Sequence, residues 1–316
     1  MKYIYLITFL LSFNLSSNSV IYTSSYIDVN KKQINNNYSI TVAGDRIISI
    51  DKGFIDVNDN KLIDLRGMTV MPGLMDMHVH FGQEYQSKAE RPSKIERETS
   101  AILAAKQAII TLKSGFTTVR QVGDSGMVAI SLRDLINSNQ IVGPRIFTSG
   151  KSIATTGGHA DPTNGKDKDS YEYPTAEDGV INGPYDAYTA VRQRYKDGAD
   201  GIKLTVTGGV LSVAKSGENP QFTADEVEAV VDAAKDYGMW VAVHAHGSVG
   251  MKRAVIAGVD SVEHGTFMTE EIMDLMIKNN VYYVPTISAG EFVACLLYTS
   301  DAADEGLGVD LGGRRI

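Results

Sequence analysis

The spacing of apolar and polar residues changes near residue 67 of the chain. Between residues 20 and 66, short stretches alternate apolar and polar side chains, and Gly, Asn and Asp separate these stretches. Alternation of this kind predicts half-buried strands joined by turns, here over residues 39–42, 46–50 and 61–65. We therefore expect residues 20–66 to form the N-terminal part of a small β-sandwich domain.

From residue 67 to residue 294, short strand candidates alternate with longer segments that are expected to form helices. This repeated order predicts an α/β fold with a parallel sheet, most simply a (β/α)8 TIM barrel, with a doubly wound sheet as the alternative. Seven strands are expected before residue 295, so the barrel would be truncated after about strand seven. Their ranges are 70–80, 117–121, 145–149, 201–206, 240–245, 261–263 and 282–285.

Helix starts and one long connection add detail to this picture. Capping boxes, in which Ser or Thr is followed three positions later by Glu, occur at residues 93–96 and 223–226. The two helices that they open are expected to stop at Gly115 and near Gly238. Residues 151–184 are polar and Gly-rich, and loops of that length are usually functional or disordered. After a barrel strand, this loop would lie on the catalytic face.

The first residues are typical of an export signal. Residues 1–13 combine one Lys with an apolar run that is too short to span a bilayer, and small residues follow at Ser17 and Ser19. We expect a secretory signal peptide over residues 1–19, with a buried first strand as the alternative. Export predicts a periplasmic or extracellular protein without a stable membrane anchor.

Residues 295–316 do not follow the pattern of a fold element. They resemble a translated sequencing adapter: residues 295–304 match one transposon-adapter segment and residues 309–316 match its far primer segment, with residues 305–308 in place of the index. We expect a non-native tail, and a real amphipathic tail is the alternative. Sequencing of the gene re-amplified from source DNA decides between them.

Composition narrows the class of partner. The chain has 316 residues, of which 43% are hydrophobic and 22% charged, as in globular proteins with a large core. Its formal net charge of −8 argues against nucleic-acid partners. The single cysteine, Cys295, excludes an internal disulfide and belongs to the suspected tail. A small-molecule substrate fits best, and the sequence leaves a homo-oligomer open.

Histidines carry the clearest chemical signal. Of the six in the chain, five lie in or directly after expected strands. His78 and His80 are two apart in one strand, so their imidazoles point to the same face, as two metal ligands must. His244 and His246 repeat this spacing, and His264 ends the next strand. Each alone is more often a core residue, but together they predict a site at the strand ends.

Two more residues belong to the candidate site. Lys203 lies between Ile202 and Leu204 in an expected strand and would point into the barrel, where burial lowers its pKa. A neutral lysine can add carbon dioxide to form an anionic carbamate that bridges two metal ions. Pairing with a carboxylate, or a solvated edge position, is the alternative. His159 follows two glycines in the long loop, and we expect it to contact substrate, with a solvated loop histidine as the alternative.

With these residues in view, the sequence resembles the amidohydrolase superfamily. The resemblance is to its imidazolonepropionase-like branch, which includes metal-dependent Xaa-Pro dipeptidases (prolidases), and it covers roughly residues 20–294. It rests on five motifs, which are VMPGLMDMHVH at 70–80, GFTTVR at 115–120, GIKL at 201–204, VHAH at 243–246 and VEHG at 262–265.

The resemblance implies a metal-dependent hydrolase that cleaves a C–N bond of a small substrate by attack of a metal-bridging hydroxide. An Xaa-Pro dipeptide or a cyclic amide would be the substrate. Two divalent ions are implied, and zinc suits the ligands. By the same resemblance, His78 and His80 hold one ion, His244 and His264 hold the other, and carboxylated Lys203 bridges them.

The resemblance also bears on catalysis. His246 matches a position at which relatives place a polar side chain against the substrate, and His246 or His159 would assist the developing oxyanion. The family's eighth strand ends in an Asp that binds metal and shuttles the proton. No Asp follows the expected strand 282–285 before the tail, and Glu291 comes too soon. The chain as written is therefore expected to be inactive.

Two other functions stay open at this point. One is a mononuclear-metal deaminase of the same superfamily, in which Lys203 has no bridging role. The other is a non-catalytic binding protein or pseudoenzyme. Metal content per chain separates the first from a binuclear hydrolase, and turnover on a broad panel of amides separates the second.

Overall fold

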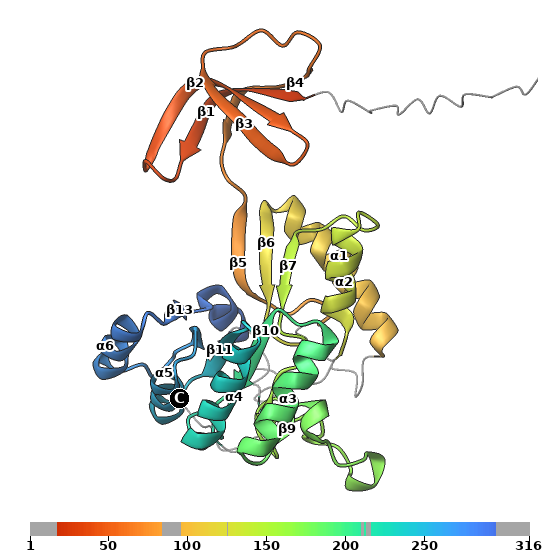
Figure 1. Cartoon of the computed structure of the whole chain (residues 1–316), viewed down its shortest axis with the longest axis vertical. Coiled ribbons are helices and arrows are strands. Elements are labelled where there is room, and N and C mark those ends of the chain that lie inside the picture. Colours follow the sequence, from red (N-terminus) through yellow and green to blue (C-terminus); the bar gives the residue numbers. More distant parts are fainter. Residues whose placement is uncertain (1–17, 84–95, 125, 210–211, 213–215, 295–316) are drawn as a thin grey trace, which may run out of the picture. The chain divides into compact units, whose positions relative to one another are not determined.

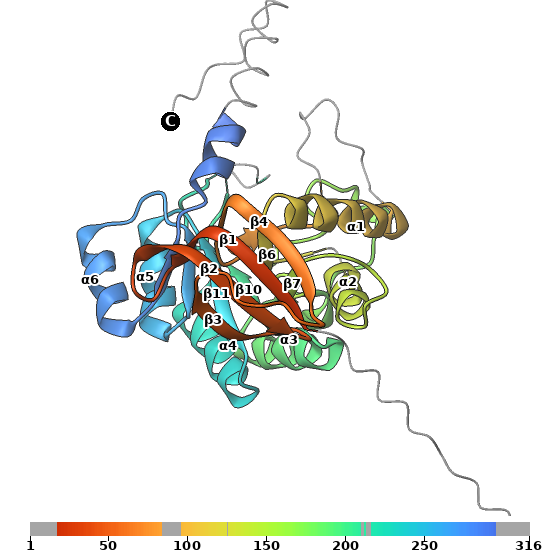
Figure 2. The same cartoon turned by 90° about the horizontal axis from the view of Figure 1, so that it is seen from above.

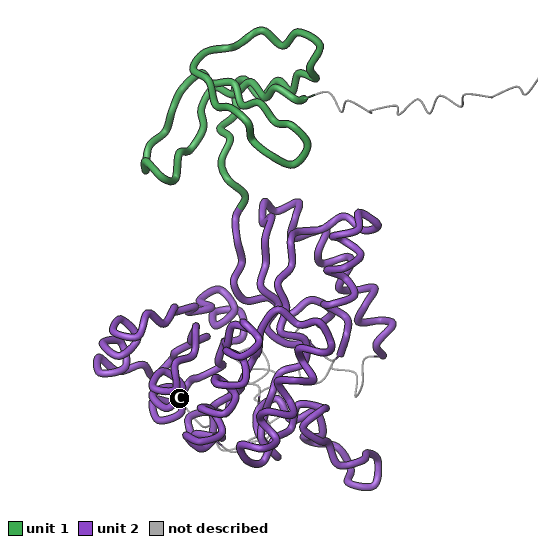
Figure 3. The backbone as a smooth tube through the Cα atoms, viewed as in Figure 1, with its two compact units in different colours: residues 1–73 green, residues 74–316 purple. Residues whose placement is uncertain are grey.

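The computed structural model describes residues 18–83, 96–124, 126–209, 212 and 216–294. They belong to two compact units, Met1–Gly73 and Leu74–Ile316 (Figure 1 and Figure 3). Nearly all of the predicted signal peptide and the whole predicted tail lie outside the described residues, as do residues 93–95 of the first capping box.

The first unit contains one four-stranded sheet in the order β3-β2-β1-β4 (Figure 1). β1 pairs antiparallel with β2 and parallel with β4. The described residues of this unit form a single sheet, so the predicted sandwich, which needs two, stays a prediction. The strands are β1 (Ser19–Asp28), β2 (Gln33–Ala43), β3 (Arg46–Lys52) and β4 (Lys61–Val70).

The second unit contains a three-stranded and a four-stranded parallel sheet, and their strands confirm the seven that the sequence predicts. The first strand differs in extent, because the chain leaves the extended ladder at residues 71–73. Pro72 lies there and has no N–H to donate. The strands are β5 (Leu74–Val79), β6 (Phe116–Gln121) and β7 (Arg145–Thr148), then β10 (Gly201–Thr205), β11 (Trp240–Ala245), β12 (Ser261–His264) and β13 (Tyr282–Val284).

Two contacts link the two sheets. The N–H of Asp200, directly before β10, donates to the carbonyl of Thr148 in β7 at 2.7 Å, and β10 also pairs with Ile153, which follows β7 in the chain. The N–H of Ile153 donates to the carbonyl of Lys203 at 2.7 Å, and its own carbonyl accepts from the N–H of Thr205 at 3.1 Å. Strand order follows chain order on both sides of these links, without the reversal that defines a doubly wound sheet. Among the described residues β5 and β13 do not pair with each other, so closure of the barrel stays a prediction.

Helices lie around the outside of the parallel strands of this unit (Figure 2). They are α1 (Arg97–Lys113), α2 (Val128–Asn137), α3 (Pro184–Asp197), α4 (Ala224–Asp236), α5 (Ser248–Ala257) and α6 (Glu270–Asn279). The predicted capping box of α4 is present: the N–H of Glu226 donates to Thr223 Oγ1 at 3.3 Å, and that of Thr223 donates to Glu226 Oε2 at 2.8 Å. No helix in the described part of the chain combines the length and apolar character needed to cross a membrane.

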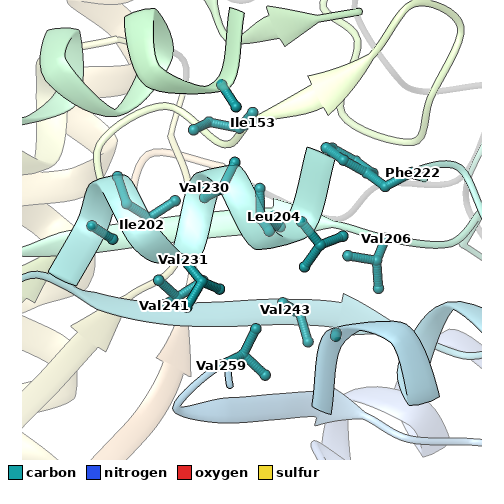
Figure 4. Close-up of a cluster of buried hydrophobic side chains, with 14 of the residues drawn as sticks. Ile153, Ile202, Leu204, Val206, Phe222, Val230, Val231, Val241, Val243 and Val259 are labelled. Carbon is teal, nitrogen blue, oxygen red and sulfur yellow. The ribbon is translucent and has the colours of Figure 1, made fainter. Parts of the chain in front are cut away.

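The core of the second unit lies between the strands and these helices. Ile202 and Leu204 of β10 are fully buried and lie beside Val230 and Val231 of α4 (Figure 4). Side chains alternate along a strand, so Lys203 points to the opposite face, as predicted. The packing of α4 on β10 thus decides that this lysine faces the inside of the arc of strands.

The long segment 151–184 contains regular structure. Two short strands, β8 (Ala154–Thr155) and β9 (Val180–Ile181), pair in parallel, and the segment also contains the 3-10 helices Lys168–Ser170 and Ala176–Asp178. Ile153 and Ile181 are fully buried. The segment is therefore anchored to the core at both ends, which gives its single histidine, His159, a defined position.

Candidate metal centre

Histidines meet at the carboxyl ends of the parallel strands. The ring centroid of His264, at the end of β12, lies 4.9 Å from that of His78 and 4.6 Å from that of His244. His264 thus connects the two pairs of ligands that the resemblance assigns to separate metal ions. The predicted ligands that the structure brings together are His78, His80, Lys203, His244 and His264, and His246 lies among them.

His78 and His80 face each other through one nitrogen each, with their Nε2 atoms 3.2 Å apart. Nδ1 of His80 lies 2.9 Å from the carbonyl oxygen of Gly123, which can only accept, so this nitrogen carries the proton. Nδ1 of His78 lies 2.8 Å from the carboxylate of Glu263, with the same consequence. Both Nε2 atoms therefore present lone pairs to each other, and two neutral rings in these tautomers cannot hydrogen-bond.

Burial keeps the rings neutral. It lowers the pKa of His80 to about 4 and that of His264 to about 2, and the nearby Lys203 adds to both shifts. Burial also holds the pKa values of His78 and His244 well below the usual value. Neutral imidazole is the form that binds metal. A divalent cation bound to both facing Nε2 atoms would satisfy them, so the donor set fits the metal that the resemblance implies.

A second group of nitrogen ligands lies at the ends of β11 and β12. One ring nitrogen from each of His244, His246 and His264 lies within 4.8 Å of the other two. The resemblance gives His246 to the substrate, whereas in the structure its ring nitrogen lies in one group with those of His244 and His264. Nδ1 of His246 is 2.7 Å from Thr266 Oγ1, a residue for which the sequence gave no signal.

Fixed hydrogen-bond partners orient the other two rings. Nε2 of His244 donates to the carbonyl of Gly208 at 2.9 Å, which leaves the lone pair on Nδ1. Nδ1 of His264 lies 2.8 Å from Thr286 Oγ1. The backbone of His264 has φ +71°, a left-handed conformation that is rare without glycine. The hydroxyl of Tyr283 donates to its carbonyl at 3.0 Å and helps to hold this conformation.

Lys203 lies in the middle of β10, and only 3% of its surface is exposed. Burial lowers the pKa of its ammonium group to about 8, while the charge of Glu263 opposes the shift and that of Arg120 favours it. The neutral amine that carbamate formation requires is therefore accessible at mildly alkaline pH. This agrees with the sequence-based expectation of a buried lysine with a lowered pKa.

His159 joins the cluster by stacking on His244, with ring centroids 4.2 Å apart and planes inclined by 20°. The backbone N–H of His159 donates to Oε1 of Gln221 at 2.8 Å. Its ring atom Nδ1 is buried and has no hydrogen-bond partner among the described residues. Gly209 leaves room for this stack, because a Cβ atom there would lie 2.6 Å from Cε1 of His159 and 2.9 Å from Cε1 of His244.

Glu263 is the main residue that sequence reasoning left without a role. It is fully buried, and its Oε1 accepts from Nη2 of Arg120 and from Oγ of Ser261, each at 2.6 Å. Its Oε2 faces His78. A signal was present, because the alternation of Ser261, Val262 and Glu263 places the carboxylate on the inner face of a buried strand, where it needs partners.

Gln121, which is also fully buried, is a second residue that the sequence did not reveal. Its Oε1 accepts from the N–H of Phe81 at 2.7 Å, and its amide group donates to the carbonyl of Gly123 at 3.3 Å. Since Gly123 is also the acceptor for His80, Gln121 fixes the backbone on both sides of that ligand. A single Gln at the end of a strand that also contains two threonines and an arginine gave only a weak sequence signal.

The described residues hold no strand after β13 that could carry the proton-shuttling Asp. Residues 287–294 are helical, and Glu291 is exposed. The acids that follow, among them Asp301 and Asp304, lie outside the described residues. The Asp therefore stays a prediction for a longer chain.

Comparison with known proteins gives a consistent picture. A sequence profile of the amidohydrolase family matches residues 69–303, which reach into the predicted tail. A solved Xaa-Pro dipeptidase with methionine bound in its active site is 70% identical, with a TM-score of 0.86, over 88% of this chain and 69% of that chain. A prolidase complexed with N-methylphosphonate-L-proline is 30% identical, with a TM-score of 0.75, over 85% of this chain and 66% of that chain.

A curated relative comes from a fungus. The ochratoxinase of Aspergillus niger is 30% identical over 236 residues, which are 70% of this chain and 48% of the relative. The chain thus spans about half the length of the curated relatives that it matches first.

Proposed function

The chain belongs to the amidohydrolase family, and from this membership we propose that it is a metal-dependent hydrolase that cleaves the amide bond of a small substrate. The observation that carries the proposal is the approach of two Nε2 lone pairs, those of His78 and His80, to 3.2 Å within a cluster of neutral imidazoles. The 70% identity to an Xaa-Pro dipeptidase supports an Xaa-Pro dipeptide as substrate, with a cyclic amide as the second choice.

In this proposal the cluster holds two divalent ions, and zinc suits its ligands. His78 and His80 would hold one ion, His244 and His264 would hold the other, and Lys203, as a carbamate, would be a ligand to both. The carbamate forms when the neutral Nζ attacks the carbon of carbon dioxide, which makes an N–C bond and releases a proton to solvent. When bound, such ions polarise an amide carbonyl and make hydroxide available near neutral pH.

His159 and His246 act on the substrate. Nδ1 of His159 is buried without a partner among the described residues, so a polar substrate group that reaches it satisfies this atom. A hydrogen bond from His246 or His159 to the developing oxyanion would stabilise the transition state. Transfer of a proton to the leaving nitrogen is assigned to the Asp that we expect beyond the described residues.

One observation favours a second candidate, a deaminase with a single ion. The nitrogen ligands of His244, His246 and His264 lie within 4.8 Å of one another, which suits one ion bound without Lys203. In that case His246 is a ligand, and the carbamate is not needed.

Metal content and turnover decide between the candidates. The protein encoded by the gene re-amplified from source DNA, called the uninterrupted gene below, is expected to contain two ions per chain by elemental mass spectrometry and to release proline from Xaa-Pro dipeptides. Lys203→Ala should lose one ion and most turnover, whereas the surface variant Lys196→Ala should keep both. One ion per chain together with an active Lys203→Ala would support the deaminase. Two ions without turnover on a broad amide panel would support a binding protein.

Export and the tail belong to the same proposal. We propose that residues 1–19 are removed during export to the periplasm or the medium, and that residues 295–316 are not native. N-terminal sequencing of the secreted protein should start near Val20. Sequencing of the gene from source DNA should diverge from the printed sequence after residue 294.

A further inference from the structure

We propose that Glu263 is the positioning residue of the metal centre: its carboxylate holds the proton of His78 on Nδ1 and so directs the Nε2 lone pair toward the ion. This inference rests on the metal site of the proposed function and deepens it. It assigns a role to a buried carboxylate that is not itself among the proposed ligands.

The two oxygens of Glu263 have different partners, and this difference carries the inference. Oε1 accepts two hydrogen bonds, from Nη2 of Arg120 and from Oγ of Ser261, each at 2.6 Å. Oε2 lies 2.8 Å from Nδ1 of His78. Since a carboxylate oxygen only accepts, the single N–H of the neutral ring must point to Oε2. The lone pair then remains on Nε2, the atom that faces His80 at 3.2 Å.

Arg120 is the charged partner of this carboxylate, and it is itself held in place by two further contacts. Its Nε donates to the carbonyl of Met77 at 2.9 Å, and its Nη1 donates to Oγ of Ser261 at 3.0 Å. The guanidinium also lies 5.3 Å from the ring centre of Trp240. A fully buried carboxylate needs such a paired charge. Arg120 therefore stabilises Glu263 as an acceptor, while Ser261 fixes which oxygen remains for His78.

These contacts make the replacement of Glu263 by glutamine informative. Arg120 and Ser261 both donate at the position of Oε1, so the amide oxygen must occupy it. The NH2 group then takes the position of Oε2 and donates to Nδ1 of His78. The ring proton is forced onto Nε2, which can no longer bind metal. The variant changes side-chain volume very little, so it tests the tautomer rather than the packing.

The tautomer can be measured without metal. The sample is metal-free protein from the uninterrupted gene, labelled with 15N-histidine. Long-range 15N–1H spectra should show His78 protonated on Nδ1. The signal of His78 is assigned as the one that disappears in the His78→Asn variant. Glu263→Gln should shift the proton to Nε2 and weaken zinc binding by about 10- to 100-fold in a chelator competition. Glu228→Gln, which makes the same chemical change on the exposed face of α4, should alter neither.

The outcomes separate this inference from the proposed function. A proton on Nε2 of His78 in the unsubstituted protein overturns the inference, as does a Glu263→Gln variant that keeps both the Nδ1 tautomer and its zinc affinity. Failure of the unsubstituted protein to bind zinc at all, with His78 still protonated on Nδ1, overturns the metal site and leaves the role of Glu263 in the tautomer intact. If Glu263→Gln does not fold, Glu263→Asp replaces it as the test. Its carboxylate can only accept, so the variant should keep the Nδ1 tautomer of His78 and bind zinc within about tenfold of the unsubstituted protein. A switched tautomer in Glu263→Asp contradicts the inference.

Discussion

Hydrogen-bond acceptors behind the rings decide what each imidazole of the centre offers to a ligand. The carbonyl of Gly123 accepts the hydrogen bond from Nδ1 of His80, and that of Gly208 accepts the hydrogen bond from Nε2 of His244. Burial prevents a second proton from binding under ordinary conditions. The chemistry of single residues is therefore set by backbone carbonyls that are distant from the rings in sequence.

Gly209→Ala tests how tightly the stack of His159 on His244 is packed. The added Cβ would approach Cε1 of His159 to 2.6 Å, so one ring must move. We expect a loss of about 1–3 kcal/mol in the free energy of unfolding and weaker zinc binding. Gly290→Ala is the control, because a Cβ there meets nothing within 4 Å. Equal denaturant midpoints and zinc affinities for the two variants would contradict the prediction.

Acidification should destabilise the metal-free protein. Burial lowers the pKa of His80 and of His159 to about 4, whereas both are near 6.5 in the unfolded chain. Between about pH 6.5 and pH 4 the unfolded state binds more protons than the folded state, so the free energy of unfolding falls as pH falls. The slope is on the order of 1 kcal/mol per pH unit for each such histidine. Urea melts measured between about pH 7 and pH 5 should show it, and His159→Gln should flatten it. A slope that His159→Gln leaves unchanged would refute this account.

At the scale of helices and strands, local sequence signals placed the elements well. The capping box at Thr223 and Glu226 opens α4, and the seven expected strands are the seven parallel strands of the structure. The exception is the first of them, where one predicted strand is interrupted at residues 71–73. The short strands β8 and β9 were not expected, because each is only two residues long and their pairing depends on distant residues.

Thr223→Ala should weaken the attachment of α4. Its hydroxyl accepts from the N–H of Glu226, and loss of such a cap costs about 1 kcal/mol. Since α4 packs on β10, we expect a lower thermal midpoint together with unchanged zinc stoichiometry. Thr189→Ala on the exposed face of α3 is the matched control and should be neutral or slightly stabilising. A cost of less than about 0.3 kcal/mol for Thr223→Ala would show that the box contributes little.

At the scale of the molecule, the parallel strands form an arc whose last described strand, β13, has β12 as its one neighbour among the described residues. Tyr282 on β13 is 76% exposed, and Ile277 of α6 is exposed to the same fraction. An unpaired strand edge next to apolar surface favours association with other chains.

The 316-residue chain is therefore expected to aggregate when it is expressed as printed. Size-exclusion chromatography with light scattering should show large assemblies. Tyr282→Lys, which adds a charge to the exposed edge, should shift the printed chain toward smaller species. A monodisperse printed chain with a cooperative melt would contradict the expectation.

The sequence by itself determined the order of strands and helices, the residues at the strand ends and the family, because apolar periodicity and motif spacing are local properties. The tertiary structure decided what surrounds those residues. Glu263 lies beside His78 only because β12 and β5 face each other across the arc, and the stack of His159 on His244 depends on a long segment folding back. Such contacts join residues far apart in the chain, so no local pattern records them. They nonetheless set the tautomers, the burial and the pKa values on which the proposed chemistry depends.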